Sequence, residues 1–490
     1  MSPKDRNDVM TREQIGCGDG SPESSSSREC VAIIGTLITG GFVAILNQTA
    51  MATAIPSVMQ VFGLSENSGQ WLTTVFMLVN GVMIPITAFL IETFTTRHLF
   101  FGALWIFFAG TVLCAVAPSF PFLLGGRVVQ AAGAGIVMPL TMTVIFRVFP
   151  PNRRGTAMGT VGLVIAFAPA IGPTISGWIV EHYSWRTIFL LMMPIVLIDM
   201  AVGYRVLKNV TEQTFPKVDI PSIMFSMVGF GGLLYGFSSA GNSGWGDPAV
   251  VGSLSVGAVA LTAFIVRQLR LSEPILEFRV FQERTFTVAT LIGVFAFMAM
   301  ISAETILPIY MQTMAGFTAF QSGQVIMPGA LLMGLMSPIA GRIFDKVGAR
   351  VLSVVGLSIV TGTTLFFTRL TPDSALLWIT VFYAVRMLGV SMVMMPVTTA
   401  GLNALEGHLI PHGTAMNNTM RMVGASIGTG LLVTVMTMAA LSPAKAVTAA
   451  AARVHGVNIA FVVAMLISLI ALVLSFFLPN AQQSREEQES

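Results

Sequence analysis

The chain has 490 residues, of which 54% are hydrophobic and only 10% are charged, and its formal net charge is +3. Soluble domains carry roughly 25% charged residues, so a chain of this size and composition cannot cover a water-facing surface and requires a lipid bilayer. The small net charge argues against a nucleic-acid partner, and the three scattered cysteines, Cys17, Cys30 and Cys114, offer neither a disulfide framework nor a metal site.

The chain begins and ends in polar segments. Residues 1–30 mix both charge signs and contain the run Ser24 to Ser27, which predicts a disordered tail and not a signal peptide. Residues 479–490 predict a second solvated tail. Between the tails, stretches of about 20 apolar residues predict membrane-spanning helices. Fourteen are expected, near 31–54, 69–91, 98–117, 121–147, 155–180, 186–207, 218–240, 248–269, 286–313, 320–344, 350–369, 375–404, 413–440 and 455–478.

Lys and Arg are unevenly divided between the loops that join these spans. One set of alternate loops holds fourteen of them and the other set holds four. Cytoplasmic loops carry the excess of positive residues. We therefore expect the first set in the cytoplasm, and with an even number of spans both termini lie there too.

The first five spans carry polar residues and helix-bending residues. Asn47 and Gln48 lie in the first span, and Arg127 and Gln130 lie in the fourth. An arginine at the centre of a span costs at least ~2.5 kcal/mol, so Arg127 needs a carboxylate, water or carbonyl oxygens as its partner, and a structural clamp on backbone oxygens is one alternative. The fifth span contains a dense set of glycine and proline: Pro169, Gly172, Pro173 and Gly177. It predicts a kinked, tightly packed helix, with generic helix packing as the alternative.

The second half of the chain repeats the first. Four ordered matches lie at offsets of 254 to 259 residues: Ser68-Gly69-Gln70 with Ser322-Gly323-Gln324, Arg127 with Arg386, Met138-Pro139-x-Thr141 with Met395-Pro396-x-Thr398, and Gly155 to Met158 with Gly413 to Met416. We expect residues 31–207 and 286–478 to form two related six-helix bundles, and residues 208–285 to add two inserted spans. Two such halves enclose a cavity that rocking opens to alternate sides, which favours a transporter.

Two loops are candidates for a cytoplasmic gate. The loop after the second span contains Glu92 and Arg97. The loop after the tenth span contains Gly341, Asp345, Gly348 and Arg350. Glycine permits a tight turn, and the acid can pair with basic groups to hold the gate shut. The alternative is a plain positively charged loop.

A carboxyl group inside the membrane is the expected site of energy coupling. No phosphate-binding loop is present, so ATP is not the expected energy source and no cofactor is predicted. Moving one charge through 100 mV yields roughly 2.3 kcal/mol. Glu304 lies deep in the ninth span and Asp199 lies in the sixth. We expect Glu304 to couple protons together with the arginines Arg127, Arg386 and Arg421. The alternatives are that Glu304 is a static partner of Arg386 or Arg421, and that Asp199 reaches the headgroups.

Over residues 31–478 these motifs resemble the fourteen-span drug:proton antiporters of the major facilitator superfamily, the EmrB/QacA type. The resemblance implies a major facilitator fold and no enzymatic activity. It further implies proton-coupled efflux of small lipophilic drugs, cationic ones included, by a monomer in the bacterial cytoplasmic membrane. The residues at Pro169 to Gly177 resemble the family's antiporter motif. The first gate loop departs from the family pattern, because Ala88 and Thr95 replace its two glycines.

A second departure lies in the first span, where Asn47 stands in place of an aspartate. An amide cannot carry a proton, so Glu304 becomes the stronger candidate for the proton carrier. The 34 Phe and 31 Met suit an adaptable binding surface for organic molecules. The cavity candidates are Asn47, Gln48, Gln130, Phe167, Met394, Asn417 and Asn418. The alternatives are an exporter of one native compound, such as a siderophore, amino acid or lipid precursor, and a membrane sensor without transport.

Overall fold

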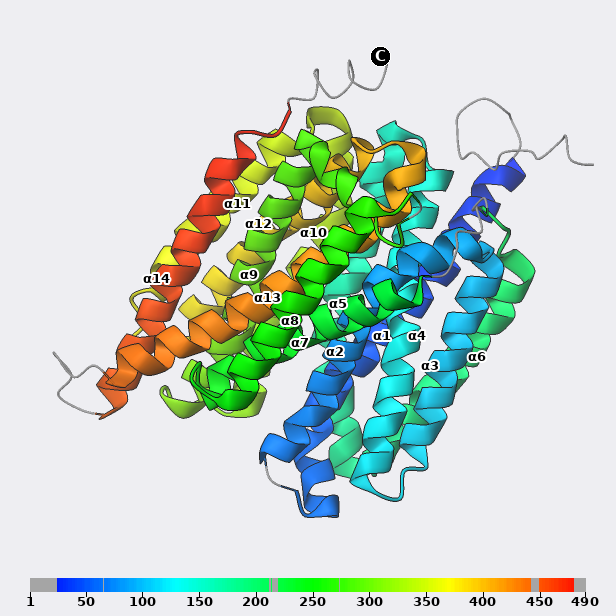
Figure 1. Ribbon diagram of the computed structural model, residues 1–490. Coiled ribbons are helices and arrows are strands. Elements are labelled where there is room, and N and C mark those ends of the chain that lie inside the picture. The colour runs from blue at the N-terminus through cyan, green and yellow to red at the C-terminus, as the bar shows by residue number, and fades with distance from the viewer. Residues whose placement is uncertain are drawn as a thin grey trace, which may run out of the picture.

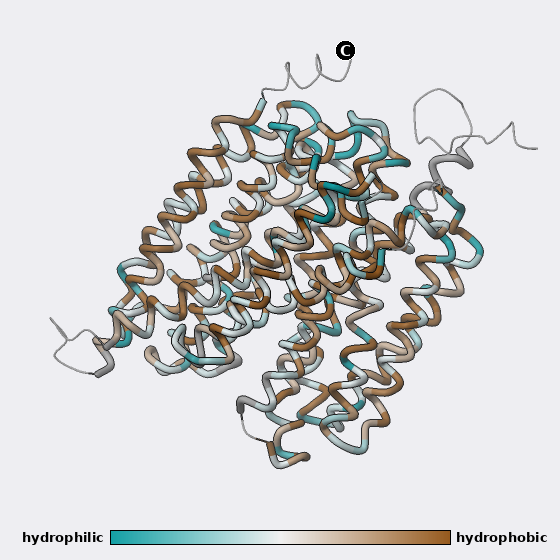
Figure 2. Tube along the Cα trace, in the orientation of Figure 1, coloured by the Kyte–Doolittle hydropathy of each residue, from teal (hydrophilic) through white to brown (hydrophobic). Residues whose placement is uncertain are grey.

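The computed structural model describes residues 24–479 except 65, 211–212, 214–218, 273 and 442–448. Within these residues the chain is all-helical, and fourteen helices are long and apolar enough to span a membrane. Figure 2 shows hydrophobic residues along the helices and hydrophilic residues gathered at their ends. The prediction of an all-α fold with fourteen spans is therefore confirmed.

The helices fall into a first six, an inserted two and a last six. The first are α1 (Ser24–Phe62), α2 (Glu66–Thr93), α3 (Thr96–Ala115), α4 (Phe120–Val148), α5 (Arg154–His182) and α6 (Arg186–Val206). The inserted two are α7 (Ile220–Ser243) and α8 (Pro248–Arg270). The last are α9 (Arg284–Thr313), α10 (Ala319–Val347), α11 (Ala349–Phe367), α12 (Leu376–Asn403), α13 (Ile410–Leu441) and α14 (Ala449–Ser475).

The start of α1 corrects one prediction. The sequence places residues 24–30 in a disordered tail, whereas α1 begins at Ser24 and runs through them. Serine is favoured at helix N-termini because its hydroxyl replaces a missing backbone partner, and a polar run can therefore extend a spanning helix beyond the apolar segment.

The two sets of six helices pack in the same way. In the first set α3 packs on α4 and α6, α1 packs on α5 and α6, and α2 packs on α4. In the last set α11 packs on α12 and α14, α9 packs on α13 and α14, and α10 packs on α12. Each pair in one set has its counterpart in the other, so the chain forms two pseudo-symmetric bundles, which lie side by side in Figure 1.

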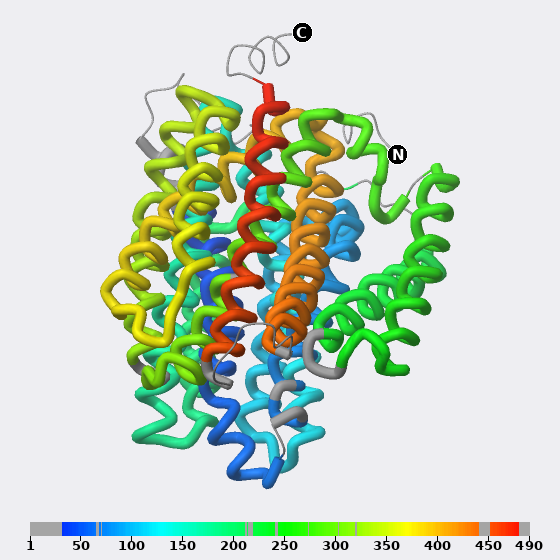
Figure 3. Tube along the Cα trace, turned by 90° about the vertical axis from the view of Figure 1, so that its left-hand side faces the viewer, coloured from blue at the N-terminus to red at the C-terminus, as the bar shows by residue number. Residues whose placement is uncertain are grey.

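The contacts between the two bundles are also related by the pseudo-symmetry. Here α5 packs on α10, and its symmetry counterpart α13 packs on α2. The inserted helix α7 packs on both α2 and α13. Figure 3 shows α7 and α8 (green) at the edge of the molecule beside α13 (orange). The inserted pair therefore covers one of the two seams between the bundles.

Both ends of the described chain lie on one side of the molecule. Figure 1 shows the start of α1 and the end of α14 at its upper side, which we call the termini side. An even number of spans requires this arrangement. The loops α2–α3, α4–α5, α10–α11 and α12–α13 lie on the same side, because each follows an even-numbered span.

The two gate loops turn by different means. Gly348 separates α10 from α11 with a φ of +79°, a conformation that glycine adopts without steric cost. The loop between α2 and α3 lacks glycine. There Thr95 adopts an extended conformation, and its hydroxyl accepts a hydrogen bond from the His98 amide at the start of α3. The missing glycines are thus replaced by a side-chain cap.

Two glycines allow the backbones of the bundles to touch on the termini side. A Cβ added to Gly341 of α10 would overlap the carbonyl oxygen of Gly155 in α5. Because the obstacle is backbone, no rotamer change can relieve the clash. A side chain at this position must therefore push the bundles apart.

We expect Gly341→Ala to destabilise the protein by about 1–3 kcal/mol through this overpacking. The unfolding temperature of purified protein, measured by intrinsic fluorescence, should fall. Gly362→Ala is the matched control, because a Cβ at Gly362 meets no atom within 4 Å. Equal unfolding temperatures for the two variants would show that the bundles do not touch at Gly341.

Candidate functional site

Arg127 is a buried clamp inside the first bundle. Its Nε donates to the Leu72 carbonyl oxygen at 3.2 Å, and its Nη1 donates to Asn47 Oδ1 at 2.6 Å and to Gln130 Oε1 at 2.7 Å. The guanidinium also lies over the Phe76 ring, 4.2 Å from its centroid. Arg127 therefore joins α4 to α1 and α2 through neutral groups, which satisfy most of its donors within the membrane.

Arg386 occupies the corresponding place in the second bundle. Its Nη2 donates to the Ala299 carbonyl oxygen at 2.6 Å, and its Nε donates to Thr364 Oγ1 at 3.2 Å. Its charge also interacts with Glu304. Arg386 therefore joins α12 to α9 and α11 and has an acid in its vicinity.

Glu304 is half-buried on α9. It interacts electrostatically with Arg386 and with the buried Tyr383. Glu304 and Asn47 are 257 residues apart, within the spacing of the sequence repeat, so they occupy related places in α9 and α1. In the first bundle an amide thus accepts a hydrogen bond from the buried arginine, whereas in the second a carboxyl group interacts with the arginine through its charge.

Asp199 lies apart from this group. It is 4% exposed on α6, and its carboxyl packs against Gly40 of α1 within the first bundle. Its Oδ2 has no hydrogen-bond partner among the described residues. The structure does not bring Asp199 together with Glu304 and Arg386.

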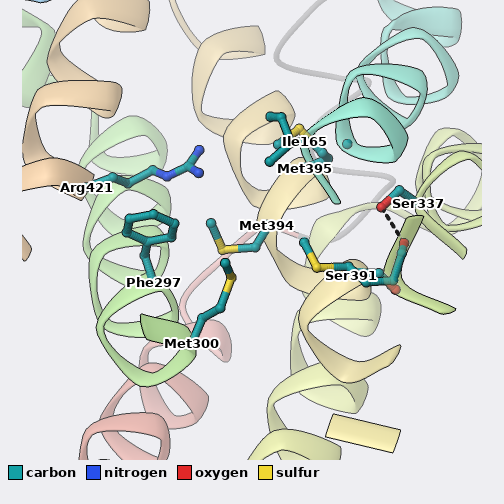
Figure 4. A pocket seen from close by; sticks show the side chains of 10 residues that line it. Ile165, Phe297, Met300, Ser337, Ser391, Met394, Met395 and Arg421 are labelled. Carbon is teal, nitrogen blue, oxygen red and sulfur yellow. Dashed lines mark hydrogen bonds between the residues drawn. The ribbon is translucent and has the colours of Figure 1, made fainter. Parts of the chain in front are cut away.

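A narrow pocket with an empty volume of about 310 Å³ lies between the bundles. Figure 4 shows its lining. The walls come from α5, α9, α10, α12 and α13: Gly162, Ile165, Phe297, Met300, Met333, Ser337, Ser391, Met394, Met395 and Arg421. This space includes the open mouth of the pocket and is too narrow, as it stands, to enclose a small organic molecule. Four methionines can rearrange to enlarge it, because their side chains are unbranched and flexible.

Arg421 brings a charge to this pocket. Its side chain extends from α13 over the Phe297 ring, with the guanidinium carbon 4.8 Å from the ring centroid. The residue is 6% exposed, and its Nε and Nη1 have no hydrogen-bond partner among the described residues. The pocket is thus apolar apart from two serine hydroxyls and one guanidinium.

The predicted cavity residues are only partly at this pocket. Met394 lines it, and Phe167 packs beside it against Gly334. Asn47 and Gln130 are instead buried around Arg127. The remaining predicted residues, Gln48, Asn417 and Asn418, do not line this pocket; Gln48 is half-buried, and both asparagines are largely buried on α13.

Sequence reasoning missed most of the pocket lining. Ser391, Met394 and Met395 recur at helical spacing on α12, as do Phe297 and Met300 on α9. This spacing of methionine with serine or phenylalanine was the available signal, but the same pattern occurs on lipid-facing and core surfaces.

The glycine- and proline-rich part of α5 packs on α1. A Cβ at Gly172 would overlap the Thr49 hydroxyl, and Ser176 Oγ donates to the Ala50 carbonyl oxygen at 2.6 Å. The helix is continuous through Pro169 and Pro173, and Gly177 also lies beside α1. These residues therefore form a seam within the first bundle.

Asp345 crosses between the bundles on the termini side. Its carboxylate accepts hydrogen bonds from the Gly155 amide at 2.9 Å, the Thr156 amide at 3.0 Å and the Thr156 hydroxyl at 2.7 Å. These amides belong to the first turn of α5, where the helix dipole favours a negative charge. The acid of the second gate loop thus caps a helix of the opposite bundle.

Glu92 makes the symmetry-related crossing with different chemistry. Its Oε1 lies 2.8 Å from Nε2 of His412 at the start of α13. His412 Nδ1 in turn accepts a hydrogen bond from the Glu277 amide at 3.3 Å. A histidine side chain has replaced the helix amides as partner of the acid. Two related contacts therefore hold the bundles together on the termini side.

The basic residues of the gate loops do not form these crossings. Arg97 donates to the Tyr204 carbonyl oxygen at 2.9 Å and lies over the Tyr204 ring, so it ties α3 to α6 within the first bundle. Arg350 lies in the first turn of α11. A further crossing that the sequence did not indicate joins Arg154 Nη1 to Asn403 Oδ1 at 2.8 Å.

Comparison with known proteins identifies relatives along most of the chain. The profile described as Major Facilitator Superfamily matches residues 37–429. The uncharacterized MFS-type transporter YcnB of Bacillus subtilis is 54% identical over 456 residues, 93% of this chain and 96% of that protein. The lincomycin resistance protein LmrB of Listeria monocytogenes is 40% identical over 461 residues, 92% of this chain and 97% of that protein. The solved proton:xylose symporter XylE has a TM-score of 0.65 at 14% identity, covering 93% of this chain and 97% of that one.

The crossing between Glu92 and His412 can be tested by a double-mutant cycle. We expect Glu92→Gln and His412→Gln to be less than additive in unfolding free energy, with a coupling of about 0.5–3 kcal/mol, because the two side chains contact each other and are largely buried. The measurement is the unfolding of purified protein in denaturant.

Glu406 and His408 supply the control cycle. Their side chains lie 3.3 Å apart but are 79% and 71% exposed, so solvent should reduce their coupling to nearly zero. Additive effects at Glu92 and His412 would mean that this contact does not stabilise the closed termini side.

Proposed function

The chain belongs to the major facilitator superfamily, and from this premise we propose that it exports small lipophilic molecules, including antibiotics, in exchange for protons. It is a multi-span membrane transporter of small molecules and not an enzyme. The proposal places it in the bacterial cytoplasmic membrane as a monomer with both termini in the cytoplasm. The similarity to a lincomycin resistance protein supports the export of drugs.

The placement of Glu304 carries the proposal. On α9, Met300 of the pocket and Glu304 are four residues apart, so they lie on the same helix face one turn from each other. Glu304 lies about 30 Å along α9 from its first residue, and therefore nearer the side opposite the termini. A half-buried carboxyl group in this place can exchange protons with water and act on the wall of the pocket.

Arg386 links the charge of Glu304 to helix packing. When Glu304 is ionised, its carboxylate attracts the nearby guanidinium of Arg386. When Glu304 takes up a proton, this attraction is lost, and Arg386 keeps only its bonds to α9 and α11. Binding of a proton can shift the equilibrium between two conformations by no more than the difference in its binding free energy to the two. Protonation of Glu304 therefore changes the attraction between α9 and α12, and an alternating transporter can use this change to switch conformation.

Three contacts between the bundles on the termini side must break before the pocket can open to that side. Asp345 with α5, Glu92 with His412, and Arg154 with Asn403 all join the two bundles there. In the proposed cycle they hold the cytoplasmic side closed while Glu304 and the pocket communicate with the outside. Opening towards the cytoplasm requires all three to separate.

A methionine-lined pocket favours varied substrates over one native compound. Flexible thioether side chains adapt to ligands of different shape. Four of the ten lining residues are methionine, and only one is charged. The alternative of an exporter dedicated to a single metabolite would use the same proton machinery, but this lining gives it no support.

We expect Glu304→Gln to abolish coupled transport. In inverted membrane vesicles with an imposed proton gradient, a neutral lipophilic antibiotic such as chloramphenicol should release protons through the wild type. This release should fall at least about tenfold in the variant, because the amide cannot carry a proton. Glu304→Asp should retain part of the activity. A pH-sensitive dye inside the vesicles reports the release.

Glu181→Gln is the matched control, because Glu181 is an exposed glutamate at the end of α5. It should transport like the wild type. Undiminished proton release in Glu304→Gln would remove Glu304 from the mechanism. ATP-dependent flux after the gradient has been dissipated would refute proton coupling altogether.

A further inference from the structure

We propose that Arg421 binds an acidic group of the substrate, so that the molecules recognised by this pocket are lipophilic anions such as aromatic carboxylates or phenolates. The term substrate rests on the function proposed above, whereas the anion site rests on the geometry of the pocket. The sequence motifs described above do not indicate this anion site.

The first observation is that the guanidinium has no hydrogen-bond acceptor among the described residues. Arg127 and Arg386 each donate to at least two acceptors. Arg421 is 94% buried, yet within the described residues it makes no hydrogen bond or ion pair, and its Nε and Nη1 are fully enclosed. A buried cation without an acceptor is strongly unfavourable, so its retention requires a partner that is present during function.

The second observation is that the guanidinium faces a pocket suited to an apolar ligand. Figure 4 shows Arg421 reaching from α13 towards Met394 and Met395, with Phe297 below it. The hydroxyls of Ser337 and Ser391 already donate to the carbonyl oxygens of Met333 and Leu388. They remain able to accept but do not neutralise a charge. An anion with an apolar body therefore complements both the guanidinium and the methionines.

The third observation argues against a cationic ligand. Aromatic faces can hold organic cations, but the face of Phe297 is already covered by Arg421 at 4.8 Å. A second positive charge in the same narrow pocket would be repelled, because the low dielectric inside a protein strengthens the interaction.

Glu304 does not serve as the missing partner. Its electrostatic neighbours are Arg386 and Tyr383, and Arg421 is not among them. Glu304 lies seven residues beyond Phe297, about 10 Å along α9. The proton carrier and the anion site are thus separate groups about two helical turns apart along α9.

The test uses three ligands that share one ring system: 2-naphthoate, 2-naphthamide and 2-naphthylmethylammonium. Equilibrium dialysis measures their binding to purified protein in lipid nanodiscs, without a proton gradient. We expect the wild type to bind the carboxylate about 10- to 100-fold more tightly than the amide, as for hydrogen bonds to a charged group. The ammonium ligand should bind least.

Arg421→Met should bring the affinity for 2-naphthoate down to that for 2-naphthamide and leave amide binding intact, which also shows that the pocket is folded. Methionine suits this variant because it matches the apolar lining. Arg421→Lys should retain part of the preference. The exposed Arg369 supplies the control Arg369→Met, which should bind like the wild type.

The proposal is overturned if the wild type binds 2-naphthoate no better than 2-naphthamide, if the ammonium ligand binds most tightly, or if Arg421→Met keeps the preference. The first two outcomes need no variant. Loss of gradient-driven transport with the anion preference intact would contradict the proposed function alone. Coupled transport without any anion preference would contradict the anion site alone.

Discussion

A guanidinium keeps its charge in a protein, and leaving it unpaired inside a membrane costs a large free energy. This constraint determines the surroundings of the arginines inside the two bundles. Three arginines lie well inside the described spans, away from the helix ends: Arg127, Arg386 and Arg421. Arg127 is satisfied by amide and carbonyl oxygens and holds the first bundle together. Arg386 shares its surroundings with an acid. Arg421 lies over the Phe297 ring and faces a pocket, and its Nε and Nη1 have no acceptor among the described residues. The same side chain is thus accommodated in three ways: by neutral oxygens, beside an acid, and at a pocket.

The pseudo-symmetry of the fold allows residues at related positions of the two bundles to be compared. Each helix pair of the first bundle recurs in the second, so unlike residues at related places mark a division of roles. At the related places of Asn47 and Glu304, the first bundle has an amide and the second has an acid. On the termini side Asp345 caps a helix, whereas Glu92 meets the imidazole of His412. The duplicated scaffold is therefore nearly symmetric in packing and asymmetric in chemistry.

Much of this fold could be predicted from the sequence, because lipid imposes a length and a composition on every span. The repeat identified the related halves, and the cost of an intramembrane arginine singled out Arg127 and Arg386. The sequence did not reveal that Ser24 begins a helix or which partners Arg127 selects. The pocket lining was also missed, since methionine and phenylalanine occur everywhere in such a chain. The pairing of Glu92 with His412 joins positions 320 residues apart and follows only from three-dimensional packing.

The unpaired charge of Arg421 has a consequence for voltage. A cycle that moves one proton inwards and one monovalent anion outwards transfers two elementary charges in the same electrical direction. Each charge crossing 100 mV contributes roughly 2.3 kcal/mol, so an inside-negative membrane potential would drive such export through both partners. A neutral cargo would use the potential only once, and a monovalent cation would cancel it. By selecting the charge of the cargo, one arginine side chain would thus set how many charges each cycle moves and how strongly the transporter concentrates its cargo outside the cell.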